Sequence, residues 1–390
     1  MDKAAFLPPG SVRARAEDPR AYLTALRAQG KVVVDAGEKV VLDPAGVERV
    51  LTDFAHFSCN GSNFYGRSRA IIPQQTDPPL HTRYRRLLTP LMSVRRMAVL
   101  EPELVARTNA CIDGFIGRGW CEARAELAVP VPGISLMNLL GLPVEDLPFF
   151  MDFKDAILRP RALSDDVDEQ LRIQREFADA STRYFTEVIA KRRAAPGDDL
   201  ISGMMAADVD GVKLTDDEIL DVCFQLPMAG LDTVTATIAL GLIFFAGRPD
   251  LQDVLASRPE MVESAVEELL RWETPNTALK RQVAQETEIE GCPFHPGERA
   301  LASIGAANYD PSRFERPLEF DIARAPNRHM TFGTGQHTCL GNHLARPELR
   351  VVLREWHKRI PRYRVKAGAV IAYSDDNMTR TVAEAPLEWV

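Results

Sequence analysis

Apolar residues recur three and four positions apart over most of residues 44–275 and again after residue 341, and this spacing predicts helices. Loops are expected at 58–80, 159–168 and 194–213. The run K-V-V-V-D-A-G-E-K-V-V-L at 31–42 predicts two short strands around a turn, and Pro44 predicts a helix start. Residues 276–325 mix short strand-like pieces with Gly and Pro. We therefore expect one domain over residues 1–390, mainly α with minor β.

The longest predicted helix begins at a capping box, T-D-D-E at 215–218, and runs to about Gly247. Its middle reads A-G-L-D-T-V, and three features there weaken a helix. Pro227 lacks an N–H, Gly230 has low helix propensity, and Thr233 can bond back to a carbonyl one turn earlier. These features predict a groove with a function or, equally, a kinked core helix with close packing.

Composition narrows the class of protein. The net charge of −8 argues against a nucleic-acid binder, and 45% hydrophobic with 26% charged residues is ordinary for a globular protein. The first twenty residues show no signal-peptide pattern, and the apolar stretch 238–246 is too short to anchor the chain in a membrane. Six scattered cysteines without a C-x-x-C pair suit a reducing cytoplasm, where we expect the protein.

One cysteine has distinctive neighbours, in the string F-G-T-G-Q-H-T-C-L-G at 332–341. Its three glycines allow positive φ or close approach to a flat ligand. A predicted helix follows at once, and its N-terminal end would stabilise a thiolate at Cys339, as a haem-iron ligand requires. The alternative is an inert buried cysteine in a Gly-rich turn.

The whole string resembles the haem-binding signature of the cytochrome P450 family, F-G-x-G-x-H-x-C-x-G. The resemblance implies the P450 fold, a helix-rich triangular prism with small β-sheets. It also implies haem b, with the Cys339 thiolate as the ligand of the iron. The residues expected to line the haem are Phe332, Gly333, Gly341, Ala229 and Gly230.

Two further segments carry the resemblance. A-G-L-D-T resembles the family's oxygen-binding groove, which implies that Thr233 hydrogen-bonds dioxygen and Asp232 relays protons. Glu268 and Arg271 fit the E-x-x-R motif that supports folding and haem incorporation, although a lone pair of this kind is usually a surface salt bridge. Many bacterial relatives have Arg at the position of Tyr309, so the third partner of the pair is expected to be Arg313 or Tyr309.

His81 and Arg85 are four residues apart on one predicted helical face, in D-P-P-L-H-T-R-Y-R-R. A basic surface turn is the ordinary explanation. By the resemblance, this pair binds the haem propionates together with His337 and Arg281, because four donors suit two carboxylates.

The likeness to soluble bacterial members, especially the camphor-hydroxylase type, extends from about residue 55 onward. It implies substrate contacts for eight residues: Phe64, Tyr65, Arg69, Ile72, Met228, Thr277, Met378 and Thr379. Arg69 would hold an oxygen or carboxylate of the substrate, or would be an ordinary exposed loop arginine.

No flavin or nicotinamide fingerprint is evident, so electrons are expected from a ferredoxin. Five arginines predict a basic docking patch, or simply solvated helix faces: Arg83, Arg86, Arg346, Arg350 and Arg354. Pro347 is expected to kink the helix that carries three of them.

The leading hypothesis is a monooxygenase that inserts one oxygen atom from O₂ into a small or medium apolar organic substrate. The alternatives are a haem-thiolate enzyme with peroxide or reductive chemistry, a haem sensor without turnover, and a helical protein without haem.

Overall fold

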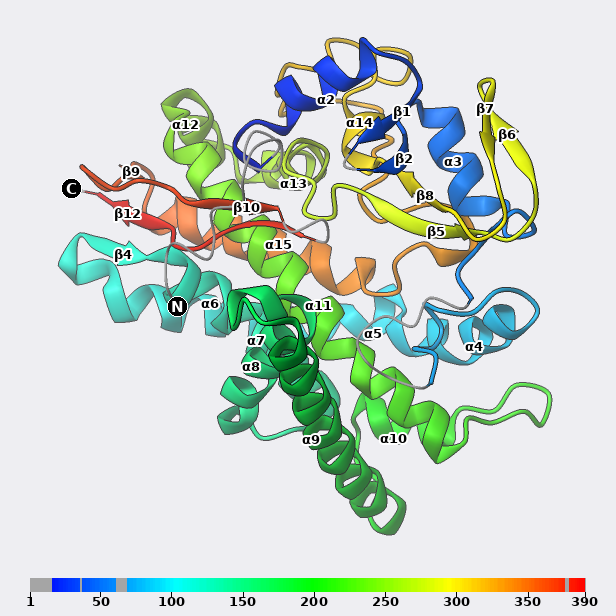
Figure 1. Cartoon of the computed structure of the whole chain (residues 1–390). Helices are drawn as coiled ribbons and strands as arrows, with labels where there is room; N and C mark the ends of the chain where they lie inside the picture. The colour runs from blue at the N-terminus through cyan, green and yellow to red at the C-terminus, as the bar shows by residue number, and fades with distance from the viewer. Residues whose placement is uncertain (1–15, 36, 61–68, 376–378, 390) are drawn as a thin grey trace.

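The capping box and the long apolar run of the central segment do form one helix, α11 (Asp216–Ala246), in the computed structural model of the chain. The structure describes residues 16–35, 37–60, 69–375 and 379–389. Both halves of the capping box are made between Thr215 and Glu218, and the helix continues through Pro227. In Figure 1, α11 runs through the middle of the molecule, and it packs against α7, α8, α9 and α15.

Helices make up most of the described chain. The other α-helices are α2 (Pro19–Arg27), α3 (Pro44–Thr52), α4 (Leu80–Leu88), α5 (Val94–Ala98), α6 (Glu101–Phe115), α7 (Pro130–Leu140), α8 (Leu147–Leu158), α9 (Val167–Ala194), α10 (Leu200–Ala206), α12 (Pro249–Ser257), α13 (Val262–Trp272), α14 (Ile304–Asn308) and α15 (Asn342–Arg359). The short helical turns are η2 (Thr89–Met92), η3 (Ile116–Arg118), the π-turn η4 (Arg124–Ala128), η5 (Val144–Asp146), η6 (Pro160–Ala162), η7 (Pro259–Met261) and η8 (Gly335–His337).

The strands form small sheets. They are β1 (Val32–Asp35), β2 (Glu38–Val41), β3 (Phe57–Ser58), β4 (Trp120–Glu122), β5 (Leu279–Val283), β6 (Thr287–Ile289), β7 (Cys292–Phe294), β8 (Arg299–Ala302), β9 (Arg364–Val365), β10 (Tyr373–Asp375), β11 (Arg380–Val382) and β12 (Pro386–Glu388). The largest sheet has the order β1-β2-β8-β5-β3, with β2 and β8 parallel, and it lies beside α2 and α3 in Figure 1. The mainly α fold with minor β expected from the sequence is confirmed.

Several of the elements predicted from the sequence are present, but one predicted loop contains a helix. The strands of 31–42 and the helix starting at Pro44 form as predicted. The segment 194–213, expected as a loop, contains α10, which Asp199 caps by accepting from the Ser202 N–H. The helix α15 runs to Arg359 and continues through Pro347.

Among the described residues, α11 alone is long and apolar enough to cross a membrane. Within its most apolar window, 78% of the residues are buried inside the protein. This is the pattern of a core helix, because a membrane span presents such residues to lipid.

A buried carboxyl group on α15 gives the fold a pH dependence. Glu348 is 2% exposed, and burial raises its pKa to about 8. Between the ordinary glutamate pKa and pH 8, the folded state holds a proton that the unfolded state releases. Glu348 alone should therefore lower the stability by about 1.4 kcal/mol per pH unit across this window, whereas histidines with a lowered pKa act in the opposite direction below about pH 6.5. Denaturant melts at several pH values should show a difference in slope of about 1.4 kcal/mol per pH unit between the wild type and Glu348→Gln, read above about pH 6.5, where the histidines no longer titrate.

Glu355 provides a matched control on the same helix. Burial raises its pKa, but hydrogen bonds from Asn109 and Arg354 outweigh burial and lower it. Glu355→Gln should leave the slope above pH 5 as it is in the wild type. Equal slopes in the wild type and Glu348→Gln would contradict the assignment.

Candidate functional site

The segment around Cys339 is a tight loop between η8 and α15. The Cys339 N–H donates to the Phe332 carbonyl at 2.9 Å. Gly333 and Gly335 both have φ of +69°, as expected for the first two glycines, and a Cβ at Gly335 would lie 2.6 Å from Thr52 Cγ2. Gly341 has φ of −78°, so of the two alternatives for these glycines only close approach is left for it. A Cβ there would lie 3.8 Å from Cys339 Sγ, so glycine keeps the space beside the sulfur open.

The electrostatics of Cys339 are balanced between opposing effects. Surrounding protein raises the pKa of the thiol, while the N–H groups of Gly341 and Asn342 and the guanidinium groups of Arg85 and Arg346 lower it. The helix end acts as expected, but the protein around the sulfur outweighs it, although the Cys339 side chain is itself exposed to solvent. Full ionisation therefore requires a cation at the sulfur, which is the role that a metal ion fills.

The middle of α11 presents small and polar side chains. Ala229 is exposed and Gly230 half-buried, although most of the helix around them is buried. Thr233 Oγ1 donates to the Ala229 carbonyl at 3.0 Å, which confirms the predicted back-bond. Asp232, next to Thr233 in the sequence, is 4% exposed.

Asp232 is held by two cations from the α8 region that the sequence argument missed. Arg159 donates to both Asp232 oxygens at 2.8 and 2.7 Å, and Lys154 Nζ lies 3.4 Å from Oδ1. Burial opposes ionisation of Asp232, but Arg159 and Lys154 outweigh it and hold the pKa of the carboxyl far below its usual range. Asp155 also accepts from both cations. A lysine within the apolar run of α8, Lys154, was the feature of the sequence that could have indicated a buried acidic partner.

Four basic side chains gather beside the cysteine loop. The rings of His81 and His337 lie 3.9 Å apart, and Arg85 and Arg281 are close enough to lower the pKa of both. Burial is the larger cause, and the pKa falls to about 4 for His81 and about 3 for His337. Arg85 Nη1 donates to the Thr338 carbonyl at 2.7 Å.

Both ring nitrogens of His81 are buried without a hydrogen-bond partner among the described residues. A buried donor without an acceptor destabilises a protein by about 1–3 kcal/mol. The unpaired ring of His81, close to two guanidinium groups, therefore fits a site that binds an anionic acceptor. The donor set of the four side chains therefore suits carboxylates.

Glu268 and Arg271 form a buried ion pair rather than a surface one, since both are 0% exposed. The two oxygens of Glu268 accept from Arg271 at 2.7 and 2.8 Å. The third partner is Arg324, whose Nε lies 3.1 and 3.2 Å from the same carboxylate. The two candidates named from the sequence were both wrong. Arg313 donates to a backbone carbonyl, and Tyr309 donates to the Trp272 carbonyl at 2.6 Å.

The residues expected at the substrate are not all described. Phe64, Tyr65 and Met378 lie outside the described residues. Ile72 and Met228 belong to one buried apolar cluster, and Thr379 is also buried. Arg69 pairs with Asp221 at 2.8 Å and with Asp217 at 2.7 Å, so its charge is neutralised by α11 in this structure.

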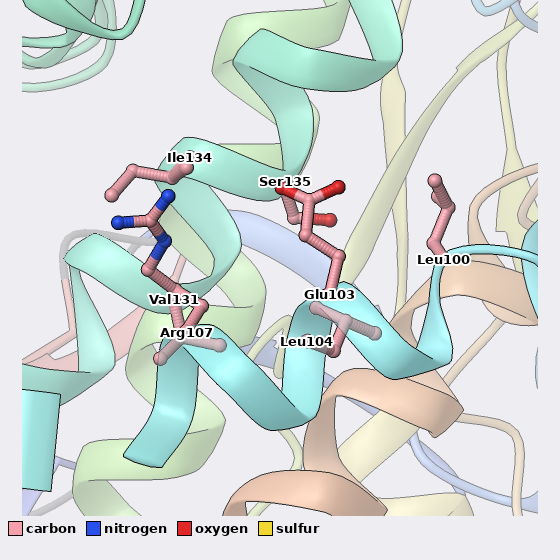
Figure 2. A pocket seen from close by; sticks show the side chains of 7 residues that line it. All are labelled: Leu100, Glu103, Leu104, Arg107, Val131, Ile134 and Ser135. Atoms are coloured by element: carbon pink, nitrogen blue, oxygen red, sulfur yellow. The ribbon is translucent and has the colours of Figure 1, made fainter. Parts of the chain in front are cut away.

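Thr277 lines a cavity of about 300 Å³ between α2 and the five-stranded sheet, with Tyr22 and Lys280 among its other walls. A smaller cavity between α6 and α7 has room for about one water molecule. Figure 2 shows Glu103 and Arg107 reaching from α6 toward Ile134 and Ser135 of α7. None of the predicted site residues lines this second cavity.

The expected basic patch is largely neutralised. Each of its five arginines faces a carboxylate, and the pairs are Arg83–Glu218, Arg86–Asp210, Arg346–Glu267, Arg350–Glu263 and Arg354–Glu101. Each carboxylate comes from a segment far from its arginine in the sequence, so the arginines alone do not reveal the pairing. The docking patch therefore stays a prediction, made by five arginines that are each paired with a carboxylate in this structure.

Comparison with known proteins decides the family. A family model described as Cytochrome P450 matches residues 148–359. A probable cytochrome P450 127A1 of Sinorhizobium fredii is 32% identical, over 93% of this chain and 88% of its own. The chain belongs to the cytochrome P450 family.

Other P450 proteins extend the likeness. A steroid C26-monooxygenase of Mycobacterium tuberculosis is 32% identical over 75% of this chain and 78% of its own length. The solved structure of the myxobacterial P450 CYP267B1 in complex with myristic acid is 30% identical, with a TM-score of 0.88, covering 97% of this chain and 98% of that one.

Membership establishes the general chemistry. P450 proteins are haem-containing monooxygenases that hold haem b through a cysteine thiolate and use O₂, a redox partner and an organic substrate. The residues of this chain fit that group. The chain offers groups of the kinds that a propionate-bearing macrocycle requires, namely a cysteine just before a helix, small residues on α11 and four donors suited to carboxylates.

Proposed function

We propose that this P450 is a single-domain cytoplasmic monooxygenase that oxygenates an apolar substrate with electrons from a ferredoxin. The observation that carries the proposal is the buried Asp232 carboxylate, clamped by Arg159 and adjacent in sequence to the Thr233 hydroxyl. Oxygen insertion needs protons brought to one place while bulk water stays out. A peroxide-using or purely reductive enzyme has no such need for a buried acid beside a hydroxyl.

Cys339 is proposed as the thiolate ligand of the iron, with Phe332, Gly333, Gly341, Ala229 and Gly230 around the ring. When bound, haem supplies the oxygen-activating chemistry, which a thiolate ligand promotes. His81, Arg85, Arg281 and His337 hold the propionates through charge-assisted hydrogen bonds. Glu268 and Arg271 fix the segment that leads to the cysteine loop.

Thr233 and Asp232 control the delivery of protons to the oxygen-binding pocket. In this structure, the Thr233 hydroxyl proton is donated to the Ala229 carbonyl, so donation toward the pocket requires this bond to be given up. Asp232 releases or takes a proton only when its contact with Arg159 loosens, because Arg159 holds the carboxyl ionised. The pair therefore acts as a gated relay rather than an open water channel.

The substrate is proposed to be apolar and of fatty-acid or steroid size. The support is that relatives include a steroid C26-monooxygenase and a P450 crystallised with myristic acid. Ile72 and Met228 would offer apolar contacts, and Thr277 and Thr379 would offer hydroxyl groups. All four are buried, and the Thr379 hydroxyl donates to Asn276 Oδ1 at 3.3 Å in this structure. Phe64, Tyr65, Arg69 and Met378 complete the proposed set.

Thr233→Ala tests the proposal. With a ferredoxin and its reductase, the variant should still consume NADH, but the product formed per NADH should fall at least about tenfold. Thr237 provides the control, since its hydroxyl donates to the Thr233 carbonyl one turn along the same helix. Thr237→Ala should keep the wild-type ratio, and an unchanged ratio in Thr233→Ala would contradict the role.

A further inference from the structure

Three side chains with metal-binding atoms meet next to the basic cluster. They are Cys59, which follows β3, Asp77, which precedes α4, and His337, which ends η8. Their ligand atoms all lie within 4.8 Å of one another. Of the three, only His337 belongs to the site predicted from the sequence.

The distance between the sulfur and the imidazole nitrogen matches a zinc site. Cys59 Sγ lies 3.5 Å from His337 Nε2. Bonds of about 2.3 Å from zinc to sulfur and about 2.0–2.1 Å to nitrogen, at a tetrahedral angle, place these two ligand atoms about 3.5 Å apart. The distance between these two atoms therefore suits an ion bound by both.

The third ligand is already oriented by hydrogen bonds. Asp77 Oδ1 accepts from the Cys59 N–H at 3.0 Å, and Oδ2 accepts from the Ser58 hydroxyl. Carboxylate ligands of metals commonly carry such supporting hydrogen bonds and keep a lone pair for the ion. The ring of His337 is similarly supported, because it lies against the ring of His81 at 3.9 Å.

The charges nearby select the kind of ion. Burial raises the pKa of the Cys59 thiol to about 11, and Arg281 partly opposes this. Only an ion that binds thiolate strongly can displace that proton beside a guanidinium group. One S, one N and one O ligand favour Zn²⁺ or Cd²⁺ over Mg²⁺ or Ca²⁺.

We propose that Cys59, Asp77 and His337 form a three-ligand site for a zinc-class ion at the edge of the proposed propionate site, with water in the fourth position. Binding through Nε2 leaves the proton of the His337 ring on Nδ1. A metal-bound histidine characteristically donates this second N–H to a carboxylate or carbonyl. The ion would also join three segments, the end of β3, the start of α4 and η8, into one unit.

The test is a titration of the purified holoprotein with Cd²⁺, read as the ultraviolet thiolate-to-cadmium charge-transfer band. We expect one equivalent to bind, and Zn²⁺ to displace it. Cys59→Ser should remove the band, and Asp77→Asn should weaken Cd²⁺ binding by about 10–100-fold. Cys292→Ala is the control, because Cys292 is a partly exposed thiol on β7, away from the three ligands.

Absence of the band in the wild type, or its survival in Cys59→Ser, would overturn the site. The carbon monoxide spectrum of the reduced Cys59→Ser protein is recorded alongside. A normal spectrum shows that the variant is folded with its haem bound, so failure of the metal site is distinguished from failure of the proposed haem function.

Discussion

Asp232→Asn is expected to slow product formation about 100-fold, equivalent to about 2.7 kcal/mol in the barrier. The amide keeps the size of the side chain but cannot carry a proton between solvent and Thr233. Substrate binding should be unchanged, because the carboxylate faces Arg159 and Lys154. The measurements are the turnover rate with a ferredoxin system and the spin-state shift on substrate addition.

Asp155→Asn is the matched control for this prediction. Asp155 accepts from the same two cations, Lys154 and Arg159, but it lies on α8 and not beside Thr233. Its loss should disturb the charge cluster without removing the relay. Equal slowing in both variants would mean that the cluster acts through structure alone, and an unslowed Asp232→Asn would remove the carboxyl from the mechanism.

Glu268→Gln is expected to destabilise the protein by about 3–5 kcal/mol, because it leaves two buried guanidinium groups, Arg271 and Arg324, without their carboxylate. The loss of this pair should also disturb the cysteine loop. Arg271 also donates to the carbonyls of Asn308, Pro317 and Glu319. These hydrogen bonds hold the segment that precedes the cysteine loop. Chemical denaturation and the haem content after purification measure the two effects.

Glu267→Gln is the control on the same helix. Glu267 pairs with Arg346 and His329 but is partly exposed, so solvent reduces the loss. We expect this variant to lose less stability than Glu268→Gln and to retain its haem. A loss in Glu268→Gln no larger than in Glu267→Gln would show that the buried pair is not essential.

Sequence alone predicts features that depend on neighbouring residues. The capping box of α11, the back-bond of Thr233 and the tight loop before α15 all follow from local propensities, and all are present. The family signature around Cys339 is equally local. These predictions succeeded because each depends on residues within about ten positions of one another.

The missed features depend on pairing between distant segments. Arg159 meets Asp232 across 73 positions, and Arg324 meets Glu268 across 56. Nothing in the spacing of a sequence marks such a pair, so Arg313 and Tyr309 were chosen by proximity to a motif instead. The same limit affected the arginine patch, where carboxylates such as Glu218 and Glu267 arrive from other helices.

The central claim is that Cys339 binds the iron as a thiolate, and the most direct measurement is the absorption spectrum of the reduced protein under carbon monoxide. The account predicts a strongly red-shifted Soret band for the wild type and its absence in Cys339→Ala, while the Cys59→Ser protein keeps it. A wild-type protein without this band, or a Cys339→Ala protein that retains it, would contradict the account.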